Sequence, residues 1–385
     1  MAWTVAFPAA RAEREGGNNM FLAMRELKHA RSRFLLIGFI MVMIASLTLI
    51  ISGLANGLSD DNASAIKRMK ADFLVYQSDA EFKLSRSSLP RERLAQIAEQ
   101  DGVREATPLA QTMLTLSRDG SERKSDVTLF AIDTKGMLMP PIVEGVSPAV
   151  NDAHEVVVDR SLQVDGVKLG DTLTITDTKA TMKVVGFAEG QTFSHTPVVY
   201  MDMKNMDAMM DMLGRQASPY NAIAIIGDPS VPDTLASHID GVETATLKEA
   251  MSGIPGFKEE QGSLAMMIGF LVVIAAFVQA VFFYVITLQK TNQYGIIKAI
   301  GASNSYLARN LIGQVLLLSV AAVAISIGLT FGLSFILPAS MPFELGGGVL
   351  VSYSGLLVLV SVLGALLSLG RITQVDAMEA IGRVE

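Results

Sequence analysis

Two pairs of side chains in the segment FKEEQGSLAMMIGF could bind a ligand that carries a metal. Glu259 and Glu260 come first, and Met266 and Met267 follow about two helical turns later. Thioethers ligate soft metal ions such as Cu(I), and also the iron of haem. In the plainer alternative, the glutamates are only solvated at a membrane interface and the methionines only pack.

A methionine-rich stretch, YMDMKNMDAMMDMLG, offers further thioethers. Met206, Met209, Met210 and Leu213 recur at helical spacing, so they form one apolar face of a helix. Methionine also fills irregular cores well. We therefore predict packing for this stretch, although its sulfur atoms could in principle ligate Cu(I) or haem iron.

The other residues that could carry chemistry form no catalytic set. The chain has no cysteine, which removes disulfides, thiol catalysis and thiolate metal sites. The histidines lack metal-ligand spacing, and we interpret them as ordinary surface or core residues. They are His29, His154, His195 and His238. No G-x-x-x-x-G-K-S/T nucleotide motif occurs, and the net charge of −7 indicates no nucleic-acid partner. We expect neither enzyme activity nor an intrinsic cofactor or metal.

Long apolar runs dominate the chain. Half of its 385 residues are hydrophobic and only 18% are charged, which is more apolar than an ordinary soluble protein. Four runs reach the roughly 20 residues that cross about 30 Å of hydrocarbon as a helix. The predicted transmembrane helices cover residues 34–58, 263–289, 306–337 and 348–370. The first run is too long for the apolar core of a signal peptide, so we expect it to remain as a span.

Basic residues mark the cytoplasmic side of a membrane protein. Those that flank the runs on one side are Arg25, Lys28, Arg31, Arg33, Lys290, Lys298, Arg309, Arg371 and Arg383. Both termini are therefore expected in the cytoplasm, with an amphipathic helix at 20–33 on the inner membrane surface and a tail at 371–385. Residues 1–19 have no apolar period, and we expect a disordered arm or a true start at Met20.

The long segment 59–262 is expected to fold on the other side of the membrane, which also carries a short loop at 338–347. Its strand-like stretches are DFLVYQ, VTLFAI, HEVVVD, DTLTIT, KVVGFA, PVVYMD and NAIAIIG. PRERLAQIAEQDG, MKNMDAMMDMLG and DTLASHIDG are typical of helices. The predicted fold is an α-helical membrane protein with four transmembrane helices and an extracytoplasmic α+β domain inserted between spans one and two.

A basic segment at 290–305 separates the second and third runs. Ile296 and Ile300 recur at helical spacing, which predicts a short amphipathic helix between Gly295 and Gly301, with Gly301 as its stop. Ser303 then caps the third span. Such a helix could dock into a groove on a cytoplasmic partner, and its motion would pass into the flanking spans.

This segment resembles a known family. YGIIKAIGAS is similar to the coupling-helix signature, commonly written around REIGILKAIGAS, of the FtsX-like, MacB-like ABC transporter permeases. The four-span order with a domain after span one and the ending DAMEAIG, similar to the family's P-x-EAL-R, extend the resemblance over nearly all of the chain after Met20. One departure is Asn292-Gln293-Tyr294 in place of the usual Arg-Glu, which removes an acidic contact to the ATPase.

The resemblance implies a permease of the mechanotransmission type in the plasma membrane of a bacterium. Two copies would pair with two copies of a separate ATPase, which would bind ATP and move the coupling helices. The residues that match the coupling helix are Tyr294, Gly295, Ile296, Ile297, Lys298, Ala299, Ile300 and Gly301.

Within the family, the opening MFLAMRELKHARSRFLLIGFIMVMIASLTLIISGLANGL most resembles the haem-exporter permeases of the HrtB type and their DevC-type relatives. That resemblance makes haem the expected substrate, with the glutamate and methionine pairs of FKEEQGSLAMMIGF as candidate contacts. Span one faces this level with Asn56 and a GxxxG, Gly53 to Gly57, that permits close helix approach.

Two functions remain open at this point. The first is export of haem, or of another amphipathic molecule, from the membrane. Almost no charge lies inside the spans, so lateral entry from the lipid fits better than a polar path across the bilayer. The second is signalling, in which the ATPase moves the outer domain to activate a partner such as a cell-wall hydrolase without transport.

Overall fold

The computed structural model describes residues 31–118, 123–149, 154–214, 216–338 and 341–373. The predicted arm at 1–19, most of the predicted helix at 20–33 and most of the tail at 371–385 lie outside the described residues. The chain divides into two compact units. We call Met1–Asn56 with Ser263–Glu385 the helical unit, and Gly57–Gly262 the sheet unit.

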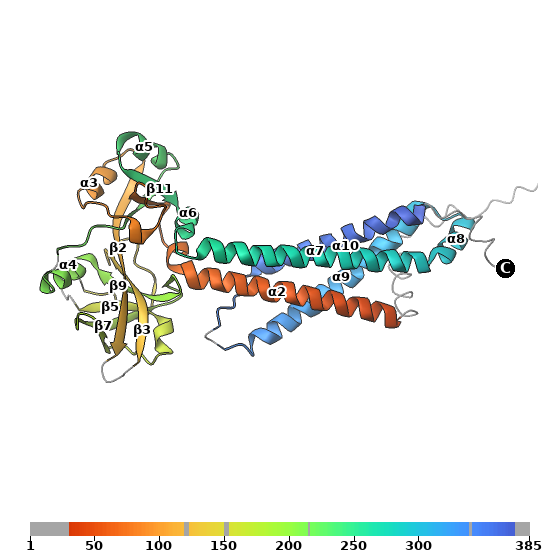
Figure 1. Cartoon of the computed structure of the whole chain (residues 1–385), viewed down its shortest axis with the longest axis horizontal. Helices are drawn as coiled ribbons and strands as arrows, with labels where there is room; N and C mark the ends of the chain where they lie inside the picture. Colours follow the sequence, from red (N-terminus) through yellow and green to blue (C-terminus); the bar gives the residue numbers. More distant parts are fainter. Residues whose placement is uncertain (1–30, 119–122, 150–153, 215, 339–340, 374–385) are drawn as a thin grey trace, which may run out of the picture. The chain divides into compact units, whose positions relative to one another are not determined.

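Within the described residues, four helices are long and apolar enough to cross a membrane. They are α2 (Arg31–Lys67), α7 (Phe257–Gln289), α9 (Asn304–Ser334) and α10 (Gly347–Thr373). In the helical unit they run alongside one another (Figure 1) and share one apolar core. Phe34, Phe283, Leu311 and Ala365 each come from a different one of these helices and are buried together. At Gly364, α10 approaches α7 so closely that a Cβ would lie 3.2 Å from the backbone nitrogen of Ala280.

The short helix α8 (Thr291–Ala299) follows α7 directly. We predicted that it would start at Gly295, and this is wrong: Gly295 lies inside α8. Helical hydrogen bonding is already established before the glycine, because the N–H of Tyr294 donates to the carbonyl of Lys290 at 2.9 Å. Glycine is disfavoured inside a helix by only about 1 kcal/mol, so the hydrogen bonds of the neighbouring helical turns can offset this cost.

The end of α8 and the start of α9 are as predicted. Gly301 has a φ of +104°, a left-handed conformation that suits glycine just beyond a helix. The Oγ of Ser303 accepts a hydrogen bond from the N–H of Tyr306 at 3.2 Å and thereby caps α9.

A mixed eleven-stranded sheet forms the centre of the sheet unit. Nine strands run in the order β11-β1-β10-β2-β3-β9-β5-β7-β4, β6 pairs with β2 and β7, and β8 pairs with β9. The pairs β3–β9 and β5–β7 are parallel. The strands are β1 Phe73–Gln77, β2 Val103–Arg118, β3 Lys124–Ile132, β4 Ile142–Gly145, β5 Glu155–Asp159, β6 Thr172–Ile175, β7 Thr181–Ala188, β8 Thr192–Phe193, β9 Thr196–Asp202, β10 Ala222–Gly227 and β11 Val242–Thr246.

Both faces of this sheet are covered, because alternate residues of a strand enter different cores. In β1, Val75 belongs to one apolar cluster, whereas Leu74 and Tyr76 belong to the other. The first cluster holds residues of α3 (Arg93–Ala98), α4 (Met203–Met212) and α5 (Val231–His238). The second holds Ile66 from the last turns of α2 and Ala250 of α6 (Leu247–Ser252).

The methionine-rich stretch packs as predicted. Met206 and Met209 of α4 are buried in the first cluster, and Met210 and Leu213 pack against it. Four membrane helices with an inserted αβ domain agree with the predicted layout. The description "α-helical" was too narrow, because a large sheet organises the inserted domain.

Candidate functional site

Four side chains meet where α2 ends and α7 begins inside the sheet unit. We call Asp61 and Asn62 of α2, His195 of the β8–β9 turn and Glu260 of α7 the helix-end cluster. The Nδ1 of His195 lies 2.7 Å from the Oδ2 of Asp61, and its Nε2 lies 3.6 Å from the Oε2 of Glu260. The Nδ2 of Asn62 donates to the same Glu260 oxygen at 3.0 Å. The imidazole therefore lies between two carboxylates on two different helices.

The turn that carries His195 is strained. Ser194 and His195 have φ values of 52° and 60°, and the left-handed region costs a residue with a Cβ roughly 1–2 kcal/mol. The N–H of Ser194 donates to the carbonyl of Asn62 at 2.8 Å. Backbone strain of this kind persists only where contacts with the surrounding structure stabilise it. Here the hydrogen bond to Asn62 of α2 is such a contact.

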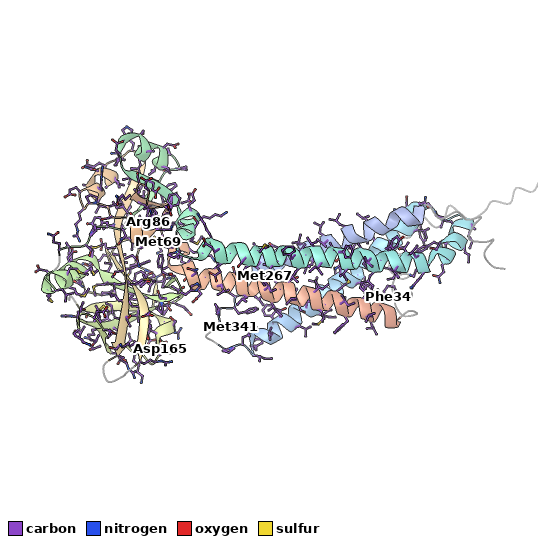
Figure 2. The ribbon with its side chains drawn as sticks, in the orientation of Figure 1. Phe34, Met69, Arg86, Asp165, Met267 and Met341 are labelled. Atoms are coloured by element: carbon purple, nitrogen blue, oxygen red, sulfur yellow. The ribbon has the colours of Figure 1, made fainter. Side chains whose placement is uncertain are left out.

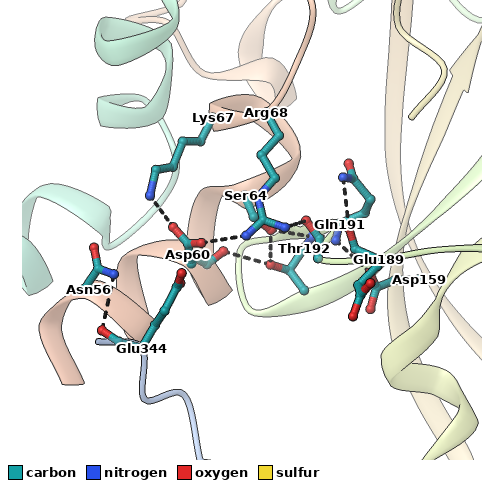
Figure 3. A network of polar contacts seen from close by, with 11 residues as sticks. Asn56, Asp60, Ser64, Lys67, Arg68, Asp159, Glu189, Gln191, Thr192 and Glu344 are labelled. Carbon is teal, nitrogen blue, oxygen red and sulfur yellow. Dashed lines mark hydrogen bonds and ion pairs between the residues drawn. The ribbon is translucent and has the colours of Figure 1, made fainter. Parts of the chain in front are cut away.

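A second network fixes α2 to the strand ends behind this turn (Figure 3). The carboxylate of Asp60 pairs with the ammonium of Lys67 and, at 2.8 Å, with Nη2 of Arg68. The Nη1 of Arg68 donates to the carbonyl of Gly190 at 3.2 Å, and the hydroxyl of Thr192 donates to the carbonyl of Asp60 at 2.9 Å.

The buried Asp159 of β5 extends this hydrogen-bond network to the strands of the sheet. Its Oδ2 accepts from the N–H of Gln191 at 2.6 Å, and the side-chain oxygen of Gln191 accepts from the hydroxyl of Tyr200 at 2.7 Å. The last turns of α2 are thus joined to the central strands by polar contacts as well as by the burial of Ile66.

This arrangement suits mechanical linkage better than catalysis or metal binding. Among the described residues, no group of three or more His, Cys, Asp or Glu side chains is placed to hold a metal ion. Asp61 and Glu260 contact opposite nitrogens of His195, so they cannot chelate one ion together with it. What the cluster does provide is a direct connection between the end of α2, the start of α7 and a sheet hairpin.

The candidate ligand-binding residues of α7 lie in different environments. Glu260 is held in the helix-end cluster, whereas Glu259 is exposed. Met266 and Met267 are 60% and 46% exposed, and Figure 2 labels Met267 on α7. Exposure leaves Glu259 and the two methionines accessible to a ligand, while Glu260 already has protein partners.

The structure places Asn56 in the helical unit, where it holds a loop. Its Nδ2 donates to the carbonyl of Glu344 at 3.3 Å, and the N–H of Glu344 donates to the carbonyl of Gly53 at 3.1 Å. A Cβ on Gly53 would lie 2.6 Å from the ring of Phe343. The close approach expected at Gly53 is therefore made by the α9–α10 loop and not by another helix.

The predicted coupling residues divide into two faces of α8. Tyr294 is 3% exposed and lies in the core of the helical unit, with Ile297 packed against it; Gly295 is buried and Lys298 half-buried. We call the opposite side the exposed face of α8. It consists of Ile296, 52% exposed, the exposed Ala299 and the C-cap residue Ile300, 82% exposed. Isolated exposed isoleucines are common, but two on one turn of a short helix form a small apolar contact surface.

The helix-end cluster was missed at the level of sequence. Asp61, His195 and Glu260 are far apart in the chain, and His195 was interpreted as an ordinary histidine. No spacing rule joins such residues, and only the fold brings them together. His154 and His238 fit that interpretation, because His154 contacts the carbonyl of Thr181 in β7 and His238 contacts the carbonyl of Thr234 in its own helix α5.

Comparisons with known proteins match this architecture over most of its length. Residues 34–252 match the model of the MacB-like periplasmic core domain, and residues 265–377 match the FtsX-like permease C-terminal model. The chain belongs to the FtsX-like, MacB-like ABC transporter permeases. It is thus a multi-pass membrane protein of a family that generally works with a cytoplasmic ATPase, and whose permeases are not themselves enzymes.

Two relatives of this permease carry the same description. A protein of Staphylococcus epidermidis called "Putative hemin transport system permease protein HrtB" is 32% identical, with 94% of this chain and 99% of that protein aligned. Its counterpart in Staphylococcus haemolyticus is 30% identical, over 95% and 100% of the two chains. Among solved structures, the periplasmic region of MacB from Actinobacillus actinomycetemcomitans aligns with 46% of this permease and 90% of that chain, at 14% identity and a TM-score of 0.36.

Proposed function

We propose that this permease exports haem from the cytoplasmic membrane, driven by a separate ATPase. The observation that carries the proposal is the 32% identity, over nearly the full length of both chains, to a permease described as part of a hemin transport system. Haem is a planar amphipath, so a site for it needs an apolar wall and one or two groups able to ligate iron.

One face of α7 carries apolar side chains that could form the wall and side chains that could ligate iron. Glu259, Met266 and Val273 are spaced by seven residues, which places them on one side of a helix. Phe270 and Phe277 extend the same stripe, and they are 63% and 71% exposed. We assign Met266, with Met267 beside it, as the candidate iron ligands, and Glu259 as a candidate partner for the polar edge of haem.

Glu260 and Asn56 receive a different role from the one first expected. Both already make hydrogen bonds within the protein, Glu260 to Asn62 and Asn56 to the carbonyl of Glu344. We propose that Glu260 holds the start of α7 within the sheet unit, that Asn56 holds the α9–α10 loop within the helical unit, and that neither ligates iron. The largely apolar surface of α7 supports entry of haem sideways from the lipid, because a charged path through the spans is lacking in the sequence.

We propose that the movement produced by the ATPase enters the permease through α8 and reaches the sheet unit through α2 and α7. The exposed face of α8 would dock on the ATPase, and Tyr294 and Ile297 would pass its movement to the core of the helical unit. We further propose a homodimer with two ATPase subunits, embedded in the lipid of a bacterial plasma membrane. The basic flanks support a cytoplasmic location for both termini, and the sheet unit would then lie outside.

Haem-dependent ATP turnover tests this proposal. The permease is co-purified with its ATPase in lipid nanodiscs, and ATP hydrolysis is measured across a haem titration. We expect a saturable change of several-fold, because a transported substrate must couple to the ATPase cycle. A flat response across the titration would remove haem as the substrate. A stable complex with a cell-wall enzyme, together with that flat response, would instead support the signalling role.

A further inference from the structure

The sheet unit contains an apolar cavity that the proposed export function does not use. Its volume is about 210 Å³, and it lies between the last turns of α2, the segment 82–85, the β8–β9 hairpin and α6. Ile66, Tyr76, Phe82, Leu84, Phe193 and Ile254 supply most of its wall. Burial, assisted by the nearby Glu243 carboxylate, raises the pKa of the Tyr76 hydroxyl far above its ordinary value, so this part of the wall stays uncharged.

The cavity wall is held in an unfavourable backbone geometry. Phe82 and Ser194 line the cavity, and their φ values are 58° and 52°. For a bulky residue such as phenylalanine this conformation is a clear outlier. A Cβ on Gly253 would lie 2.1 Å from the carbonyl oxygen of Phe82, so only glycine allows the two segments to approach in this way. Protein interiors contain few voids larger than a water molecule, and strained residues gather at functional sites.

The polar residues of the lining lie toward the solvent. Ser85 is exposed, Lys83, Gln111 and Ser194 are half-buried, and Met113 is 54% exposed. The ammonium of Lys83 is paired with Glu81 at 2.6 Å, so the mouth offers no strong attraction to either sign of charge. An apolar interior with a polar and nearly neutral mouth fits an uncharged apolar molecule.

We propose that this cavity binds a small uncharged aromatic molecule of one or two fused rings. An apolar cavity of about 150 Å³ takes benzene, so about 210 Å³ has room for a bicyclic ring. Pockets for drug-sized ligands start at about 300 Å³, and haem falls outside the range that this cavity accommodates. The site is therefore distinct from the proposed haem contacts on α7, and it takes a second class of ligand.

The position of the cavity gives such a ligand a route to influence the permease. Ile66 belongs to α2, and Phe193 and Ser194 belong to the hairpin that also carries His195. A ligand between them would contact the elements that the helix-end cluster ties together. Since a ligand that binds one arrangement more tightly shifts the equilibrium toward it, occupancy is expected to stabilise the arrangement seen here.

Binding of 5-fluoroindole to the full-length permease in nanodiscs tests the proposal. The ¹⁹F resonance of the probe is followed in a titration, with protein-free nanodiscs as the blank for partition into lipid. We expect a saturable shift with the unaltered protein. Ser85→Trp should weaken binding at least tenfold by closing the mouth. Ser88→Trp is the matched control, because Ser88 is exposed and lies just beyond the short 3-10 helix Leu84–Arg86 that carries Ser85, but does not line the cavity.

A second variant, Ala250→Leu, fills the cavity from α6 and should also remove the saturable shift. If Ala250→Leu does not fold, the two tryptophan variants still test whether the cavity binds the probe, because both changes are at exposed positions. Absence of a saturable shift beyond the lipid blank would overturn the proposal. So would equal affinity in Ser85→Trp and Ser88→Trp. Haem-dependent ATP turnover is measured separately, on nanodisc complexes of each variant with the ATPase. Failure of the cavity proposal and failure of the export proposal are therefore distinguishable.

Discussion

Replacing Ile296 and Ile300 together by glutamate is expected to separate the permease from its ATPase. Both side chains lie on the exposed face of α8, which we propose as the docking surface. Two unpaired carboxylates buried at that contact would cost the complex about 4 kcal/mol, or roughly a thousandfold in affinity. Co-purification of the two subunits from membranes measures the loss, and ATP-driven export should disappear with it.

The matched control replaces the same two residues by leucine. Ile296→Leu with Ile300→Leu keeps the face apolar and should retain the ATPase. Neither pair should disturb the fold, since both side chains are largely exposed, and unfolding temperature checks this. If the glutamate pair still co-purifies with a full complement of ATPase, the exposed face of α8 is not the docking surface.

Removal of the Glu260 carboxylate is expected to uncouple ATP hydrolysis from export. Asn62 is only 1% exposed, and its Oδ1 has no hydrogen-bond partner among the residues that the structure describes. Glu260→Ala would also deprive its Nδ2 of the carboxylate acceptor, and an unsatisfied buried group costs about 1–3 kcal/mol. His195 would lose one of its two carboxylates at the same time. We expect a lower unfolding temperature and at least a tenfold loss of export, measured in proteoliposomes with the ATPase present.

Two variants distinguish this positioning role of Glu260 from a general requirement for carboxylate side chains at the start of α7. Glu259→Ala removes an exposed neighbour of the same charge and should leave the unfolding temperature unchanged. Glu260→Gln keeps an oxygen that can accept from Asn62, so it should recover most of the lost stability even though the charge facing His195 is gone. Equal unfolding temperatures for Glu260→Ala and Glu259→Ala would contradict the role assigned to the helix-end cluster.

Local patterns predicted many elements well. Long apolar runs predict helices because lipid leaves the backbone no other way to satisfy its hydrogen bonds. Ser303 and Gly301 act at their predicted helix ends for equally local reasons. Strands buried on both faces were found as continuous apolar runs, as in IAII of β10. By contrast, β2 was missed: its sixteen residues include Pro108, and a proline inside an apolar run argues against a strand.

Features that depend on distant parts of the chain were beyond prediction from one sequence. The helix-end cluster joins Asp61, His195 and Glu260 across a whole domain, and no local rule couples such positions. The cavity arises from strained turns at Phe82 and Ser194, residue types that seldom adopt left-handed backbone. At Gly295 a local pattern gave a wrong prediction. This glycine was predicted to be the start of a helix, but it lies inside α8, which begins at Thr291.

Binding of haem on α7 through a thioether, as proposed above, can be followed by a spectroscopic titration. Haem is added to the nanodisc complex of permease and ATPase while the Soret band is recorded, first with the unaltered protein and then with single alanine variants. The variants are Glu259→Ala, Glu260→Ala, Met266→Ala and Met267→Ala. Met266→Leu serves as the matched control for shape, because it keeps the side-chain volume and removes only the sulfur.

We expect a saturable Soret shift in the unaltered complex. Met266→Ala and Met266→Leu should both abolish or move it, and Glu260→Ala should leave the position of the band unchanged. A featureless titration, or a shift that is the same in every methionine variant, would contradict a haem site at this end of α7.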